Sequence, residues 1–222
     1  WLMTVAKPQE FRIAFFSSPD LKSWTHLSDF GPLGATGGCW ECPDLFPLTT
    51  PTGEKKWVLI VSLNPGGFAG GSGTQYFIGD WDGTTFTTVQ NETKWIDYGR
   101  DNYAGVTYSN APDNRRIFIG WMNNWDYAAK LPSPIWRTSM TSPRELALIG
   151  GGNELLLTSH PISELKTEND YTFELTSDEN ATITIGENDN KVVISYEATT
   201  RQISIDRALA WFDGIDDVIQ KT

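Results

Sequence analysis

Short apolar runs separated by turn-forming residues make up most of the chain, and this pattern predicts β-strands along nearly all of its length. β-Branched and aromatic runs are bounded throughout by Gly, Pro, Asn and Asp. Such runs are typical of strands. Apolar residues at the 3.6-residue spacing of a helix occur only near the end, at about 208–219. The pattern therefore predicts an all-β protein.

Three of the apolar runs recur at nearly equal intervals. They begin at Trp1, Trp57 and Ile117, spaced by 56 and then 60 residues. An acidic turn followed four residues later by an aromatic residue also recurs, at Asp20 and Asp82, 62 residues apart. Repeats of this length, each with room for four short strands, indicate the blades of a β-propeller. A β-sandwich with accidental internal similarity is the alternative.

The amino-acid composition changes beyond about residue 155. Aromatic residues thin out, while Thr, Glu, Asp and Asn become more frequent. Alternating apolar and polar residues at 171–175 and 191–196 predict strands with one buried and one solvated face. Strands of this kind are typical of a β-sandwich.

The Gly-rich stretch Gly150–Asn153 is the expected boundary between these two parts. We expect a partial β-propeller over 1–152 and a partial β-sandwich over 153–222. The strand pattern that starts at Trp1 also predicts that the chain begins inside a domain.

Composition narrows the classes of partner. The net charge is -11, with 28 acidic and 17 basic residues, so a duplex of phosphates would be repelled and nucleic acid is not expected as a partner. No apolar run approaches the roughly 18 residues of a membrane span, so no membrane partner is expected. Two sequons, at Asn91 and Asn180, would accept N-glycans in a secretory pathway.

One segment combines residues that point to acid–base chemistry. Glu41 lies between Trp40 and Cys42, and Pro43 fixes the backbone after it. A partly apolar setting favours the protonated form of a carboxyl group. Glycoside hydrolysis uses such a group to donate a proton to the leaving oxygen, opposite a second carboxylate. An ordinary glutamate at a strand end is the alternative interpretation of Glu41.

Cys39 and Cys42 form a C-x-x-C pair, but neither a metal site nor a redox pair is expected from them. Zinc would need further Cys or His ligands, and the only histidines are His26 and His160, far apart in the sequence. A redox pair would stand at a helix start, which Pro43 does not favour. We expect free thiols that shape the surroundings of the nearby carboxylate.

The segment Trp40–Phe46 resembles the acid/base motif of glycoside hydrolase family 32, which comprises invertases, inulinases and levanases. Other segments are similar to that family in the same order, and the resemblance covers roughly residues 1–207. They are Ser17–Trp24, Asp97–Ala104, Gly120–Tyr127 and Trp136–Leu146. The resemblance implies a five-bladed β-propeller followed by a β-sandwich, and retaining cleavage of β-fructofuranosyl bonds.

The resemblance also implies residue roles. Glu41 would be the general acid/base of a double displacement. The family's nucleophile is an Asp in a Trp-Met-Asn-Asp-Pro-Asn-Gly stretch, and a further Asp in an Arg-Asp-Pro stretch steadies the transition state; neither stretch occurs in this chain. The chain is therefore expected to lack the first two blades or so, and to be inactive alone.

Four residues are expected to line the sugar site: Trp40, Asp101, Tyr103 and Trp125. For Trp125, a blade-packing role is an equal alternative.

Asp44 lies too close to Glu41 in the sequence to face it across a sugar, so we expect it to be a local hydrogen-bond partner. Arg100 is expected to be structural, paired to a nearby acid.

The function expected is that of a secreted β-fructofuranosidase of the exo-inulinase or invertase type, acting on sucrose, inulin or levan without a cofactor. A fructosyltransferase of the same family and a non-catalytic sugar-binding relative are the alternatives. The tail from Ala208 to Thr222 departs from the family pattern, and either an unrelated helix or a truncated coding sequence would explain it.

Overall fold

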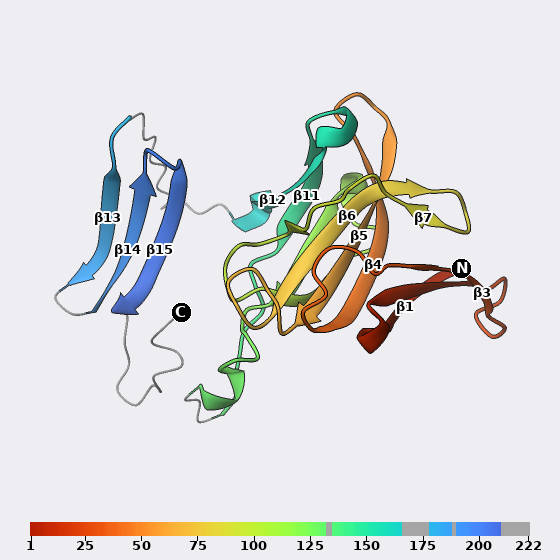
Figure 1. The fold of residues 1–222 in the computed structure, drawn as a ribbon, viewed down its shortest axis with the longest axis horizontal. Helices are drawn as coiled ribbons and strands as arrows, with labels where there is room; N and C mark the ends of the chain where they lie inside the picture. The colour runs from red at the N-terminus through yellow and green to blue at the C-terminus, as the bar shows by residue number, and fades with distance from the viewer. Residues whose placement is uncertain (132–134, 166–177, 188–189, 210–222) are drawn as a thin grey trace. The chain divides into compact units, whose positions relative to one another are not determined.

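The computed structural model describes residues 1–131, 135–165, 178–187 and 190–209 (Figure 1). It divides into two compact units. The first comprises residues 1–126 and 138–165, and the second comprises 127–137 and the chain from 166 onward. Strands dominate both, which confirms the all-β class. Within the described part of the chain, no helix is long and apolar enough to cross a membrane.

Three antiparallel sheets make up the first unit. The first sheet has the order β1 (Leu2–Lys7), β2 (Arg12–Ser17), β3 (Thr25–Phe30). The second has the order β4 (Cys39–Thr49), β5 (Lys55–Asn64), β6 (Gly73–Trp81), β7 (Phe86–Thr87), and β8 (Lys94–Trp95) also pairs with β6. The third comprises β9 (Tyr103–Thr107), β10 (Arg116–Trp121), β11 (Arg144–Ile149) and β12 (Leu156–Pro161) in sequence order. The first unit also contains the short 3-10 turns η1 (Pro8–Glu10), η2 (Pro112–Asn114), η4 (Gly152–Glu154) and η5 (Ser163–Leu165), and η3 (Ala128–Lys130) belongs to the second unit.

The internal repeat in the sequence corresponds to equivalent positions in these sheets. The recurring apolar runs are β1, β5 and β10, and the two acidic turns join β2 to β3 and β6 to β7. In each turn the aspartate Oδ1 accepts hydrogen bonds from backbone N–H groups two and three residues ahead. If β1 is matched to β5, then β2 matches β6 and β3 matches β7, so both repeats agree on a blade-like unit.

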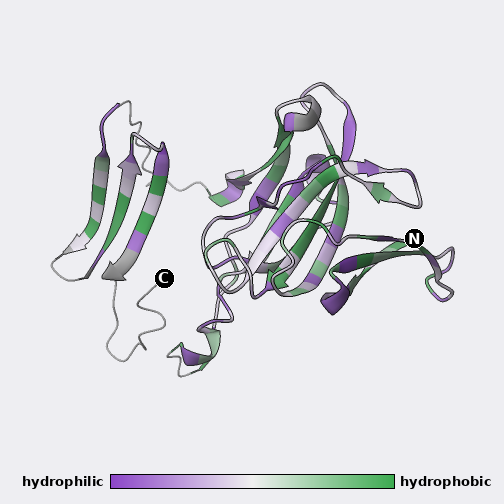
Figure 2. Ribbon diagram, viewed as in Figure 1, coloured by the Kyte–Doolittle hydropathy of each residue, from purple (hydrophilic) through white to green (hydrophobic). Residues whose placement is uncertain are grey.

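The second sheet is buried on both faces, which explains the uninterrupted apolar run of β5. Leu59, Val61 and Leu63 pack toward the first sheet, in a cluster that also contains Phe15. The alternate residues of β5 pack toward the third sheet, in a cluster that contains Phe118. A strand covered on both sides needs apolar residues at every position. Figure 2 shows this apolar concentration along the central strands.

The hairpin of β11 and β12 spans the expected domain boundary. The two strands pair from Arg144 with Pro161 to Ile149 with Leu156, and η4 forms the turn between them. Gly150 has a φ of +84°, which a residue with a side chain would adopt only with strain. The Gly-rich stretch is therefore a hairpin turn in the third sheet.

The described strands of the second unit form one antiparallel sheet of β13 (Ala181–Glu187), β14 (Asn190–Glu197) and β15 (Gln202–Leu209). Ile183, Ile194 and Ile205 are cross-strand neighbours and therefore share one face. Apolar and polar residues alternate along β13 and β15 in Figure 2. The strand expected at 191–196 is confirmed as β14.

The remaining expectations for this part have different outcomes. The strand expected at 171–175 lies outside the described residues. The helical spacing at 208–219 is a misleading signal at its start, because residues 208 and 209 continue β15. The tail from residue 210 onward lies outside the described residues.

Candidate active site

Glu41 stands at a β-bulge in β4. It is paired with Ser62 of β5, and the next regular pair joins Asp44 to Ile60, so two residues of β4 oppose one of β5 between them. Cys42, inside the bulge, has a φ of +47°, in the left-handed region that residues with side chains rarely adopt. A bulge turns the strand locally and re-aims its side chains. The partly exposed carboxylate of Glu41 is thus placed by a local irregularity of the strand.

The Glu41 carboxylate is held by a tyrosine from the neighbouring sheet. The hydroxyl of Tyr103, the first residue of β9, donates a hydrogen bond to Oε2 of Glu41. Tyr103 is buried, and Ala104 beside it has a φ of +51°. The backbone of β9 is therefore irregular next to the residue that contacts the β4 bulge. Burial and the adjacent carboxylate raise the pKa of Tyr103, so its hydroxyl remains a proton donor at all ordinary pH values.

A second link joins the same two strands. Asp44 Oδ2 accepts hydrogen bonds from the backbone N–H of Thr107, at 2.8 Å, and from its hydroxyl, at 2.6 Å. On the other side, the Thr4 hydroxyl donates to the Pro43 carbonyl at 3.1 Å. Asp44 is therefore the local hydrogen-bond partner that the sequence predicts, and it fastens the strand that carries Glu41.

Replacing Asp44 with alanine is expected to destabilise the fold by about 1–3 kcal/mol, because the Thr107 N–H loses its acceptor in a partly buried place. Urea unfolding of the variant and the parent chain measures the difference. Asp80→Ala, which removes a mostly exposed partner of Lys56, is the matched control and should change stability by less than about 1 kcal/mol. Equal effects of the two substitutions would contradict the anchoring role.

Trp40 does not lie where the sequence predicts. Its side chain has no exposed surface, and its ring packs with Phe11 and Phe77 in the core. The indole N–H donates to the Ala35 carbonyl at 2.8 Å. Because successive residues of a strand point to opposite faces, the neighbour of a site-facing Glu41 must face the core. The prediction that Trp40 contacts a sugar is therefore wrong. Its ring packs in the core on the face of β4 opposite to Glu41.

A row of aromatic rings extends outward from Tyr103. Its ring centroid lies 6.3 Å from that of Trp121, which lies 5.1 Å from that of Trp125. Tyr103 is buried whereas Trp125 is 56% exposed. The row therefore connects the Glu41 carboxylate to the exposed indole of Trp125. Tyr103 itself contacts the carboxylate with its hydroxyl, and its buried ring offers no exposed face to a sugar.

Arg100 is structural, as expected. Its guanidinium forms an ion pair with Asp126 and donates to the Ala69 carbonyl at 2.7 Å. The adjacent Asp101 is partly buried just before β9 begins. Its contact with a sugar stays a prediction.

Both cysteines beside Glu41 are free thiols, Cys42 exposed and Cys39 partly buried. Partial desolvation and the neighbouring Glu41 carboxylate raise the pKa of the Cys42 thiol. A protonated thiol is a poor nucleophile, so Cys42 is not expected to compete with the carboxylate; that it shapes the site stays a prediction.

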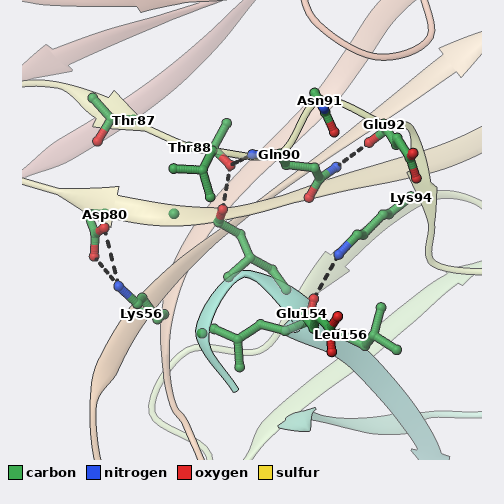
Figure 3. Close-up of a pocket in the computed structure, with 15 residues that line it drawn as sticks. Lys56, Asp80, Thr87, Thr88, Gln90, Asn91, Glu92, Lys94, Glu154 and Leu156 are labelled. Carbon is green, nitrogen blue, oxygen red and sulfur yellow. Dashed lines mark hydrogen bonds and ion pairs between the residues drawn. The ribbon is translucent and has the colours of Figure 1, made fainter. Parts of the chain in front are cut away.

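The pocket drawn in Figure 3 lies at the end of the second sheet that is far from Glu41. Lys56 lines it, and Lys56 is six residues from Ser62, the partner of Glu41, which corresponds to about 20 Å along β5. Lys56 forms an ion pair with Asp80, and Lys94 donates to the Leu155 carbonyl at 2.8 Å (Figure 3). The pocket is therefore separate from the carboxylate and is not its substrate site.

The two sequons differ in how their asparagines are held. Asn91 is exposed at the edge of this pocket. The side chain of Asn180 donates to Glu197 at 2.8 Å and accepts from the Ala198 N–H at 2.9 Å, so its amide is engaged in the second unit's sheet.

Sequence reasoning missed two residues that organise the site. Thr107 fastens β4, and Asn124 accepts a hydrogen bond from the Ser72 N–H, 52 positions away in the sequence. Both contacts cross between sheets, which no local pattern reveals. Burial of the polar Asn124 requires hydrogen-bond partners, but that burial becomes known only from the structure.

Fold and site together define a propeller-type all-β protein in which two neighbouring sheets present a glutamate clamped by a tyrosine. The chain matches the family model "Glycosyl hydrolases family 32 N-terminal domain" over residues 1–161. It is 45% identical over 174 residues to a levanase of Bacillus subtilis (strain 168), and that match covers 75% of this chain and 25% of the levanase.

Two further comparisons agree. An extracellular exo-inulinase of Aspergillus awamori is 38% identical over 217 residues, covering 90% of this chain and 40% of the exo-inulinase. A crystal structure of exo-inulinase from Aspergillus awamori superposes with a TM-score of 0.82 at 32% identity, covering 98% of this chain and 50% of that one. The chain belongs to glycoside hydrolase family 32, with part of the family's β-propeller and part of its β-sandwich. It spans only a quarter to a half of these relatives' lengths.

Proposed function

We propose that this chain is part of a secreted enzyme that removes terminal β-D-fructofuranosyl residues from sucrose, inulin or levan, with retention of configuration. The observation that carries the proposal is the Glu41 carboxylate, bound by the Tyr103 hydroxyl across two sheets. Relatives named levanase, exo-inulinase and invertase support fructans and sucrose as substrates. Exo-inulinases described as extracellular support secretion.

In the proposed mechanism, Glu41 donates its proton to the glycosidic oxygen as the bond to the anomeric carbon breaks. The nucleophile, an aspartate in the family's Asn-Asp-Pro-Asn stretch, forms the fructosyl-enzyme ester. Glu41, now ionised, then takes a proton from the water that attacks this ester and releases fructose. We call the chain joined to a segment that supplies this stretch and Arg-Asp-Pro the extended enzyme.

Surrounding residues have supporting roles in this proposal. The donor hydroxyl of Tyr103 binds Oε2 of Glu41 and so leaves Oε1 to carry the transferred proton. The exposed ring of Trp125 offers a flat surface to the apolar face of a furanose. Asp101 would bind sugar hydroxyls. We propose a propeller part followed by a sandwich part, but with the boundary after the β11–β12 hairpin, at about residue 165, instead of the expected 152/153.

Two alternatives differ from this proposal in the step after substrate binding. A fructosyltransferase would pass the fructosyl group to a sugar rather than to water. A non-catalytic relative would bind fructan or sucrose and cleave nothing. The gene upstream discriminates the second alternative, because a binding protein needs neither the Asn-Asp-Pro-Asn nor the Arg-Asp-Pro stretch.

The extended enzyme is expected to release fructose from sucrose, inulin and levan, with β-fructofuranose as the first anomer formed, because two successive inversions restore the configuration. Proton NMR during the first minutes of reaction follows the anomers before they equilibrate. Longer fructosides formed at high sucrose would identify a transferase. Binding without any release would identify the non-catalytic relative.

A further inference from the structure

Three loops gather at the end of the sheets where Glu41 lies. The loop 65–72 joins β5 to β6 beyond the pair of Cys39 with Asn64, two residues from Glu41. The segment 96–102 leads directly into Tyr103. The segment 122–126 comes after β10, whose last residue pairs with Tyr103. The three loops therefore lie at the same end of their sheets as the carboxylate.

Two of these loops present an exposed aromatic pair. Phe68 is 62% exposed and Tyr98 is 63% exposed, although their ring centroids are 4.9 Å apart in an edge-to-face arrangement. Neither ring contributes to the two core clusters. Contiguous apolar patches at a protein surface commonly mark binding sites, and these two rings form one contiguous exposed patch.

The loop that bears Phe68 is rigidly held. Arg100 donates to the Ala69 carbonyl and pairs with Asp126. Asn124 Nδ2 donates to the Gly70 carbonyl at 3.2 Å and to the Arg100 carbonyl at 2.9 Å. These bonds connect all three loops, so the aromatic pair keeps its position relative to the site.

The segment that bears Tyr98 has its own anchor. Asp97 accepts hydrogen bonds from the Gly99 N–H at 2.7 Å, from Asn102 at 3.2 Å and from Arg144 at 2.8 Å. Burial alone would raise the pKa of Asp97, but these hydrogen bonds outweigh it and hold the pKa below its ordinary value. The carboxylate therefore stays ionised at neutral pH and fixes the segment.

We propose that Phe68 and Tyr98 form an outer sugar-binding surface, which binds a fructosyl unit of a fructan chain beyond the two units that flank the cleaved bond. The inference rests on the proposed function and adds substrate length to it. Sugar rings carry apolar C–H faces that pack on aromatic rings, and rigid loops bind them at low entropic cost. Sucrose, with only two rings, is too short to use this surface.

The test is the double variant Phe68→Ala, Tyr98→Ala of the extended enzyme. Its KM for inulin should rise about three- to tenfold, the usual contribution of one or two aromatic contacts, while kcat stays unchanged. Its KM for sucrose should not change. Tyr108→Ala is the matched control, because this tyrosine is similarly exposed just beyond the other end of β9.

A binding measurement separates this inference from the catalytic proposal. In the Glu41→Ala background, electrophoresis through a gel containing inulin should retard the protein, and the double variant should lose that retardation. If the extended enzyme with Glu41 intact hydrolyses no fructoside but retardation depends on the pair, the catalytic proposal fails and the outer surface stands. Equal changes in KM for sucrose and inulin, or no change in either, would overturn the outer surface.

Discussion

The purified 222-residue chain is expected to release no fructose from sucrose or inulin at a rate typical of an enzyme. Retaining hydrolysis needs two carboxylates, and removing a nucleophile commonly costs about 10⁴-fold or more in turnover. The chain provides Glu41 but neither the Asn-Asp-Pro-Asn nor the Arg-Asp-Pro stretch. An enzyme-coupled fructose assay over many hours, at micromolar protein, is sensitive enough to measure the residual rate.

The extended enzyme is the positive control for that assay. Turnover of about 1 s⁻¹ or faster by the chain alone, within the usual range for enzymes, would contradict the prediction. Another carboxylate would then have to act as nucleophile. Asp44 is a poor candidate because two hydrogen bonds from Thr107 occupy one of its oxygens, so Asp101 would be the first residue to replace.

Much of the architecture could be predicted from the sequence because blades repeat. A strand buried on both faces needs apolar residues on both, and β5 displays this from Val58 to Val61. The acidic turns recur because an aspartate that accepts backbone N–H bonds is a local solution to a tight turn. The helical spacing was wrong at residues 208 and 209, which belong to β15, because short apolar runs carry little information on period.

The sequence predicts Glu41 as the central residue of the site, but it does not predict the hydrogen bonds that Tyr103 and Thr107 make to β4. The flanks of Glu41 indicate an acid, and Pro43 lies within the bulge that places it, where a strand tolerates proline. The bonds from Tyr103 and Thr107 close loops of 62 and 63 residues, so only the assembled sheets reveal them. The sequence already argues against Trp40 as a sugar contact, since adjacent residues of a strand point to opposite faces and Glu41 occupies the site face.

Replacing Glu41 with alanine in the extended enzyme is expected to reduce kcat on sucrose by about two to four orders of magnitude, the usual contribution of a positioned proton donor. A fructoside with an activated leaving group needs less protonation, so its first step should suffer less. Sodium azide should then accelerate the second step, because this small anion attacks the fructosyl-enzyme without a general base. Steady-state kinetics and detection of fructosyl azide measure both effects.

Glu154→Ala is the matched control, since Glu154 lines the distant pocket and should leave turnover unchanged. Tyr103→Phe adds a finer comparison: it keeps the carboxyl but removes the hydroxyl that orients it. We expect a smaller loss of kcat than in Glu41→Ala, with no gain from azide, because the general base is still present. If Glu41→Ala keeps turnover within a few-fold of the parent, another carboxylate is the proton donor, and the tyrosine clamp must serve the fold alone.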